Sequence, residues 1–311
     1  MSALRALIND SGARVLVMGV LNRTPDSFSD GGAYTTDEAA IERAKQMIGE
    51  GADIIDIGAE STRPGSQTVS DGEQIARLGT VVASVATLNT LVSIDTTSPA
   101  VAEHALMQGA TIVNCVDPTQ ASVLGALCKR YGAALILMHC RGSMSKMRGF
   151  SSTPDDAYTN VVEEVIAELQ GAAQRAMASG LARENIVLDP GFGFAKNATH
   201  SLELLGGLGK LCTLDFPVLS GPSRKSFIAH AARLGAGPQA VTSVLAPATE
   251  RLGGTIAALI ASVAAGVKLV RVHDVREARQ ALDVWTAIES ARTGQRASVG
   301  RLPLKEQVPN A

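Results

Sequence analysis

Short apolar runs recur eight times along the chain, and each is followed by a segment whose apolar positions have helical spacing. Within each run the apolar residues are nearly continuous rather than alternating with polar ones, which is typical of parallel strands covered on both faces. The runs span residues 14–22, 52–59, 91–95, 111–116, 133–139, 185–191, 216–221 and 267–274. The pattern therefore predicts an α/β protein with a parallel sheet.

Residues that start and stop helices support helical structure between the runs. Thr36 precedes an acidic first turn, and Ser98 precedes a proline at the first helical position. Gly51 and Gly109 follow expected helix ends. The predicted helices include residues 37–50, 99–108, 158–179 and 275–291.

Eight strand–helix units without a linker of biased composition predict a single (β/α)8 barrel, or TIM barrel. We expect this domain to span residues 1–293. Residues 294–311 lack hydrophobic periodicity, and we expect them to form a disordered tail. An open, doubly wound sheet is the alternative for the same pattern.

The composition excludes several classes of protein. With 46% hydrophobic residues among 311, the chain can bury a large core, unlike a disordered chain. A net charge of -2 and 3% aromatic residues give no basis for a nucleic-acid or membrane partner. The most apolar stretch, 252–267, is too short to cross a bilayer and predicts a buried helix. Four scattered cysteines fit free thiols in a reducing compartment, so we expect a cytoplasmic protein.

Polar residues stand at or near the carboxyl ends of all eight predicted strands, where barrels carry their chemistry. They include Asn22, Asp56, Asp95, Asn114, His139, Asp189, Ser223, Lys225, Arg271 and His273. Any one of them could merely satisfy loop amides. All eight ends together favour a ligand, because an unpaired buried polar group costs about 1–3 kcal/mol.

The types of these residues indicate what the ligand contains. Asp95, Asn114 and Asp189 offer carboxylate and amide edges that suit a planar heterocycle with amino, ring N–H and oxo groups. Arg63 and Arg271, by contrast, suit a phosphate or another multiply charged anion, as does His273. No P-loop, complete dinucleotide fingerprint or serine-hydrolase elbow is present.

Six segments together resemble the dihydropteroate synthases, in that family's order and over residues 14–291. They read VMGVLNRTPDSFSDGG, DIIDIGAESTRPGS, VSIDT, LDPGFGFAKN, SRKSFI and RVHDV. The resemblance implies a TIM barrel, usually dimeric, that joins 6-hydroxymethyl-7,8-dihydropterin pyrophosphate to p-aminobenzoate in folate synthesis. The products would be 7,8-dihydropteroate and pyrophosphate, and Mg2+ would be the cofactor.

The resemblance also implies roles for individual residues. The pterin would contact Asp95, Asn114, Asp189, Lys225 and Arg271. The pyrophosphate would contact Asn22, Arg271 and His273, with Asn22 also contacting Mg2+. The p-aminobenzoate would lie against Phe28, Thr62, Arg63, Pro64 and Ser223. The expected catalytic residues are Asp26, Arg63, Asp189 and Lys225.

The residue chemistry fits a dissociative, SN1-like substitution. Loss of pyrophosphate would leave a delocalised pterin cation, which the carboxylates of Asp26, Asp95 and Asp189 could stabilise. A neutral aniline nitrogen then attacks, so no activated nucleophile is needed. Loops containing glycine would shield the cation from water.

Five positions depart from the family's usual residues, and two other functions stay open. The departures are Arg23, Cys115, Arg141, Ala195 and Pro222. One alternative is a barrel that transfers a methyl group from methyltetrahydrofolate, although such a donor has no pyrophosphate for the basic residues to hold. The other is a paralogue that binds pterins without catalysis.

Overall fold

Eight parallel strands form the centre of the molecule in a computed structural model, which describes residues 2–11, 14–23, 36–60, 69–142, 153–235 and 245–293. The strands are β1 (Leu16–Asn22), β2 (Ile54–Gly58), β3 (Leu91–Asp95), β4 (Ile112–Cys115), β5 (Ala134–Met138), β6 (Ile186–Asp189), β7 (Leu219–Ser220) and β8 (Leu269–Val272). Their order in the sheet is β6-β5-β4-β3-β2-β1-β8-β7, and every pair is parallel.

The two ends of this sheet meet, so the fold is a nearly closed barrel and the open-sheet alternative is wrong. A parallel bridge joins Leu188 to Val218, and the Leu188 amide donates to the Pro217 carbonyl at 3.0 Å. Only two residues of the predicted seventh strand pair continuously with β8. The end of the domain at residue 293 stays a prediction, and the expected tail lies outside the described residues.

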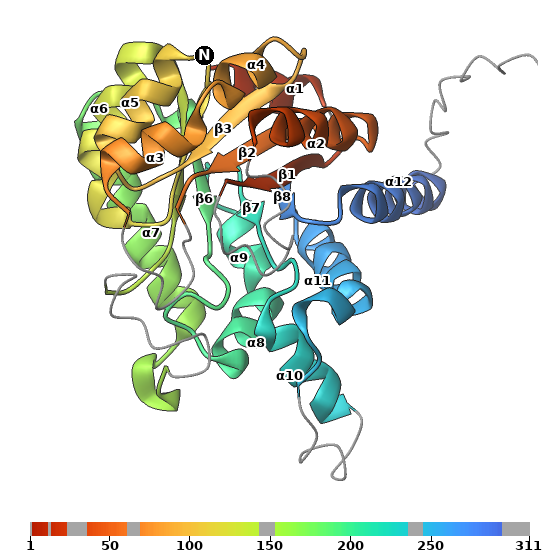
Figure 1. Ribbon diagram of the computed structural model, residues 1–311. Helices are drawn as coiled ribbons and strands as arrows, with labels where there is room; N and C mark the ends of the chain where they lie inside the picture. Colours follow the sequence, from red (N-terminus) through yellow and green to blue (C-terminus); the bar gives the residue numbers. More distant parts are fainter. Residues whose placement is uncertain are drawn as a thin grey trace, which may run out of the picture.

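Helices surround the strands (Figure 1). They are α1 (Ala3–Asp10), α2 (Asp37–Gly49), α3 (Asp71–Leu78), α4 (Val81–Ala86), α5 (Pro99–Met107), α6 (Ala121–Tyr131), α7 (Val161–Ala178), α8 (Ala198–Gly206), α9 (Leu208–Cys212), α10 (Ser226–Gly235), α11 (Leu252–Ala264) and α12 (Val275–Arg292). The predicted caps form: the Thr36 side chain accepts from the Ala39 amide, and the Ser98 side chain accepts from the Val101 amide. In the part of the chain that the structure describes, no helix is both long and apolar enough to cross a membrane.

The helix predicted to be buried, α11, is buried on one face only. Thr255, Ala258, Leu259 and Ser262 are covered, whereas the opposite face is partly exposed. The prediction was too broad because many small residues raise the hydropathy of a helix all round without requiring that it be covered all round.

An apolar layer fills the amino-terminal half of the barrel interior. It contains Leu16, Met18, Ile54, Ile112, Ala134, Ile136, Val187, Leu219 and Leu269, all buried. Helix α1, for which the sequence pattern predicted no element, packs Leu4 against this layer. The Ser2 amide, at the start of α1, donates to the Asn185 side chain just before β6 at 2.9 Å. The amino-terminal end of the barrel is therefore closed by a helix.

Candidate active site at the carboxyl end of the barrel

Strand alternation turns the candidate polar residues into the barrel. Side chains two residues apart on a strand point to the same side. Asp56 follows Ile54 by two, Asn114 follows Ile112, Asp189 follows Val187, and Arg271 follows Leu269, each of these apolar residues being in the interior layer. The same strands therefore provide an apolar lower layer and a polar upper layer.

Arg271 lies at the centre of the polar layer. Its Nε donates to Asp56 Oδ2 at 2.6 Å, and one terminal nitrogen donates to Asp95 Oδ2 at 2.9 Å. The Asn114 amide donates to the same Asp56 oxygen at 3.0 Å. Three predicted pterin residues, Asp95, Asn114 and Arg271, are thus held together by β2, β3, β4 and β8.

Asp56 is the residue that the sequence analysis missed, because it was noted at a strand end and given no role. The signal was present: an aspartate inside the run Ile54–Gly58 has the same inward parity as Ile54, so its carboxylate must be buried. The structure confirms that Asp56 is fully buried and bridges Arg271 to Asn114.

Several acceptors in the polar layer lack a partner. Among the described residues, Asp56 Oδ1, Asp95 Oδ1 and Ser93 Oγ are buried and accept no hydrogen bond. Each such group costs about 1–3 kcal/mol unless something bonds to it. The arrangement suits a ligand with several N–H donors on one edge.

Burial changes the protonation of this layer. Burial, reinforced by the charges of Asp56 and Asp189, raises the pKa of Asp95 to about 7 although Arg271 opposes it. Burial also disfavours the charge on Arg271, but the two carboxylates outweigh it and raise the pKa of Arg271. The layer therefore holds a permanent cation and a carboxyl group that can carry a proton near neutral pH.

Asp189 and Lys225 meet at the loop that follows β6. Asp189 Oδ1 accepts from the Gly191 amide at 2.7 Å. Lys225 Nζ donates to the Phe192 carbonyl and lies 4.4 Å from the centroid of the Phe194 ring. Burial lowers the pKa of Lys225 to about 8, although the charge of Asp189 opposes this shift. Burial raises the pKa of Asp189.

Hydrogen bonds between two further predicted residues, Ser223 and His273, join the loops after β7 and β8. Ser223 Oγ lies 3.0 Å from His273 Nδ1 and accepts from the His273 amide at 3.2 Å. Between Ser223 and Lys225, Arg224 has a φ of 59°, and its guanidinium binds Asp274 with two nitrogens. This ion pair holds the strained turn that separates the two site residues.

Asn22 ends β1 beside Gly58. A Cβ at Gly58 would lie 3.9 Å from Asn22 Oδ1 and 3.5 Å from Asp95 Cβ, so the missing side chain leaves a gap between them. Within the described ranges, no group of three or more His, Cys, Asp or Glu side chains could hold a metal ion. Asn22 would thus offer one amide oxygen, which fits Mg2+ only when phosphate and water oxygens complete its shell.

Five predicted residues cannot be compared with the structure. Asp26, Phe28, Thr62, Arg63 and Pro64 lie outside the described residues, so their assigned roles stay predictions. The eight predicted residues that are described lie at the carboxyl end: Asn22, Asp95, Asn114, Asp189, Ser223, Lys225, Arg271 and His273.

The departures from the family pattern have local explanations in three cases. Arg23 is buried and donates to the carbonyls of Arg77 and Thr36 and to Asp37. Cys115 is a buried thiol, and burial raises its pKa to about 12. The Pro222 carbonyl accepts from the Lys225 amide at 3.1 Å, in the turn that begins α10.

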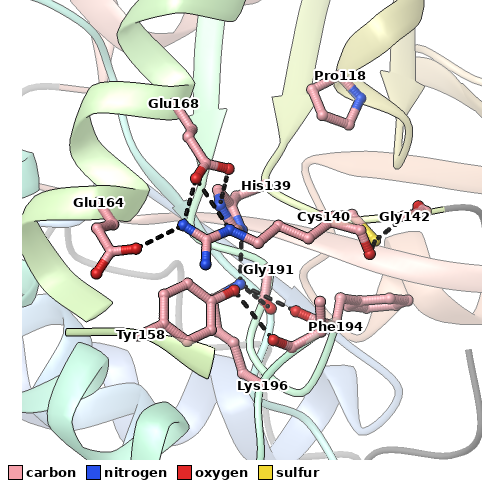
Figure 2. A network of polar contacts seen from close by, with 12 residues as sticks. Pro118, His139, Cys140, Gly142, Tyr158, Glu164, Glu168, Gly191, Phe194 and Lys196 are labelled. Carbon is pink, nitrogen blue, oxygen red and sulfur yellow. Dashed lines mark hydrogen bonds and ion pairs between the residues drawn. The ribbon is translucent and has the colours of Figure 1, made fainter. Parts of the chain in front are cut away.

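The other two departures, Arg141 and Ala195, contact a polar network that the sequence analysis also missed. Figure 2 shows His139, Glu168 and Lys196 of this network. Arg141 binds Glu164 and Glu168 of α7, and its guanidinium lies 4.0 Å from the centroid of the Tyr158 ring. Ala195 has a φ of 49°, a conformation that favours glycine. No explanation in terms of substrate follows from either residue alone.

Comparisons with known proteins give one consistent result. The family model described as pterin binding enzyme matches residues 18–273. A dihydropteroate synthase from Streptococcus pyogenes serotype M6 is 41% identical over 262 residues, covering 84% of this chain and 90% of that protein. The solved structure of dihydropteroate synthase from Thermus thermophilus in complex with 4-aminobenzoate has a TM-score of 0.74 and 40% identity, covering 88% of this chain and 95% of that one. A structure of the Thermus thermophilus enzyme in complex with 6HMPPP has a TM-score of 0.71 and 39% identity, covering 88% and 94%.

Proposed function

The chain belongs to the pterin-binding enzyme family and is an enzyme of the dihydropteroate synthase type, and we propose that its barrel joins 6-hydroxymethyl-7,8-dihydropterin pyrophosphate to p-aminobenzoate. The reaction yields 7,8-dihydropteroate and pyrophosphate and belongs to folate biosynthesis. The observation that carries the proposal is the set of buried acceptors without partners at the carboxyl end of the barrel, as far as the structure describes it.

The pterin ring suits these acceptors because its amino group and ring N–H groups form a row of donors. Asp95 and Asp189 accept from this row, and the Asn114 amide contacts the ring's polar edge. The planar guanidinium of Arg271, held from behind by Asp56 and Asp95, stacks on the ring. Lys225 binds the oxo side of the ring.

The pyrophosphate lies at the mouth of the barrel, near Asn22, Arg271 and His273. Asn22 would hold Mg2+, which would neutralise charge on the departing diphosphate. Arg271 contributes positive charge at the same place and stays charged over the whole working pH range, because its neighbouring carboxylates raise its pKa.

The substitution is dissociative. The bond between the pterin's methylene carbon and the diphosphate oxygen breaks first, and the resulting cation is stabilised by the carboxylates of Asp26, Asp95 and Asp189. The neutral amine of p-aminobenzoate then forms the carbon–nitrogen bond and loses a proton. The p-aminobenzoate is held for this attack by five residues: Phe28, Thr62, Arg63, Pro64 and Ser223.

A second copy of the chain covers the groove between α11 and α12. The groove is lined mainly by apolar side chains, among them Ile256, Trp285 and Ile288. Val284 and Ile288 are 56% and 45% exposed, which is unusual for residues of this type at a surface that stays bare. We expect a homodimer in the cytoplasm; Val284→Glu should convert it to a monomer in sedimentation, and an unchanged dimer would contradict this surface.

The function is tested by incubating the purified chain with the pterin pyrophosphate, p-aminobenzoate and Mg2+. We expect equal amounts of pyrophosphate and dihydropteroate, and neither product when one substrate is omitted. Tight pterin binding without turnover would instead support the non-catalytic alternative. Methyl transfer from methyltetrahydrofolate would support the other.

A further inference from the structure

A second polar cluster lies behind the site, where β5, α7 and the loop between β6 and α8 meet. Its centre is Lys196, which is 0% exposed and takes no part in the reaction as proposed. Figure 2 shows Lys196 pointing toward His139 and the loop carbonyls, with Glu168 on the far side of the imidazole.

The surroundings of Lys196 match an ammonium group. Its Nζ donates to the carbonyls of Gly191 and Phe194 at 3.1 and 3.0 Å, and to His139 Nδ1 at 2.8 Å. An ammonium has three N–H donors and no acceptor, so each donor has one acceptor. Burial lowers the pKa of Lys196 to about 7, although the charges of Asp189 and Glu168 oppose this shift.

His139 transmits this contact to α7. Its Nε2 lies 2.9 Å from Glu168 Oε2, so a neutral ring accepts from Lys196 on one nitrogen and donates to Glu168 with the other. Burial, together with the charge of Lys196, lowers the pKa of His139 to about 4, which agrees with a neutral ring. Arg141 holds Glu168 from the solvent side.

The loop that Lys196 binds also holds two residues of the pterin site. The Gly191 carbonyl accepts from Lys196, and the amide of the same residue donates to Asp189. The Phe194 carbonyl accepts from Lys196, whereas the Phe194 ring lies against Lys225. The Phe192 carbonyl, in the same loop, also accepts from Lys225. One side of the loop faces Lys196 and the other faces the site.

This loop needs something to hold it. Gly191, Gly193 and Ala195 have φ values of 65°, 77° and 49°, and the left-handed region costs energy for alanine. A Cβ at Gly191 would collide with the His139 carbonyl oxygen, so the loop passes directly against the end of β5. Besides Lys196, the Tyr158 hydroxyl binds the loop, donating to the Ala195 carbonyl at 3.0 Å.

We propose that Lys196 is a positioning residue, which fixes the loop between β6 and α8 so that Asp189 and Lys225 meet the pterin together. The inference rests on the proposed function of the site. Lys196 does not touch the substrate; it acts through the backbone of Gly191 and Phe194, and His139 with Glu168 orients it.

The test compares Lys196→Met with Arg279→Met. Arg279 is also a buried cation that binds a backbone carbonyl, that of Val15, but it lies at the amino-terminal end of the barrel, where it also binds Asp53. Both variants should lower Tm. The Kd of the pterin pyrophosphate, measured by calorimetry without p-aminobenzoate, should rise about tenfold or more in Lys196→Met, whereas Arg279→Met should stay within about twofold of the wild type.

Lys196→Met with wild-type Kd would overturn the proposal, as would equal weakening in both variants at equal loss of Tm. Failure of the wild type to bind the pterin pyrophosphate would overturn the proposed function itself, which is a different outcome. The two failures are therefore distinguishable in one series of titrations.

A second pair of variants keeps the test open if Lys196→Met does not fold. In His139→Gln the amide oxygen can accept from Lys196 and the amide nitrogen can donate to Glu168, whereas His139→Leu loses both hydrogen bonds. The Kd should rise in His139→Leu and recover at least in part in His139→Gln. Equal Kd values in these two variants would contradict a role for the network in positioning.

Discussion

The two halves of the barrel interior are built on the same strands and have opposite chemistry. The amino-terminal half is apolar and closed by Leu4 of α1. Two residues further along β2, β4 and β8, the carboxyl-terminal half contains Asp56, Asn114 and Arg271, together with acceptors that have no partner among the described residues. Burying a large aliphatic side chain contributes about 1.5–3 kcal/mol to stability, whereas an unpaired buried polar group costs about 1–3 kcal/mol. The stability gained from the apolar lower half therefore offsets the destabilisation caused by the unpaired polar groups of the upper half. The upper half is thereby available to bind a ligand.

The largest expected effect comes from opening the apolar half. Ile112→Ala should lower the free energy of unfolding by about 2–5 kcal/mol, because it leaves a cavity among buried side chains. Denaturant unfolding measures this change. KM for both substrates should stay at the wild-type value in the folded variant. A pterin KM that rose in proportion to the lost stability would contradict the claim that the apolar half contributes to stability alone.

The next effect comes from making the polar half apolar on the same strand. Asn114→Leu keeps the volume and removes the amide, so kcat/KM for the pterin pyrophosphate should fall by about 10- to 150-fold, equivalent to about 1–3 kcal/mol. The free energy of unfolding should change by less than about 1 kcal/mol, because Asp56 keeps its bond to Arg271. Steady-state kinetics with retained activity would show that this half does not bind the ring.

The last effect is a pH dependence that belongs to the polar half alone. The pKa of Asp95 is raised from 3.8 to about 7, so between these values the folded state binds more protons than the unfolded state. Stability from this group is present at low pH and falls as pH rises from about 4 to 7, by at most about 1.4 kcal/mol per pH unit. The difference in unfolding free energy between wild type and Asp95→Asn, measured across this range, should show that slope.

A flat difference would mean that Asp95 is ionised throughout the range in the folded protein. Asp10→Asn is the matched control, because Asp10 is exposed at the end of α1. Its unfolding curves should run parallel to those of the wild type at every pH.

Most of the barrel could be predicted because its strands are uninterrupted apolar runs. Once the fold is known, the carboxyl ends of the strands indicate where the site residues lie. The role of Asp56 followed only from its position within β2: it was noted at a strand end and given no role, although it lies two residues after Ile54 and so points into the barrel. Helix α1 was missed because its partner, the bottom of the barrel, is made of residues from all over the chain.

The role of Lys196 could not be predicted from the sequence for a different reason. A lysine beside a glycine-rich turn normally predicts a solvated side chain, and nothing local indicates that His139, 57 residues earlier, supplies its third acceptor. The strain at Ala195 is likewise a property of the folded loop, although the sequence had marked the position as a departure from the family.

The central claim is that the buried carboxylates of Asp95 and Asp189 in the upper half bind the pterin ring, and a crystal structure of the chain with 6-hydroxymethylpterin tests it most directly. We expect the ring inside the carboxyl end of the barrel, with its N–H groups about 2.7–3.2 Å from carboxylate oxygens of Asp95 and Asp189. A pterin bound elsewhere, with no ring N–H group bonded to either carboxylate, would contradict the account.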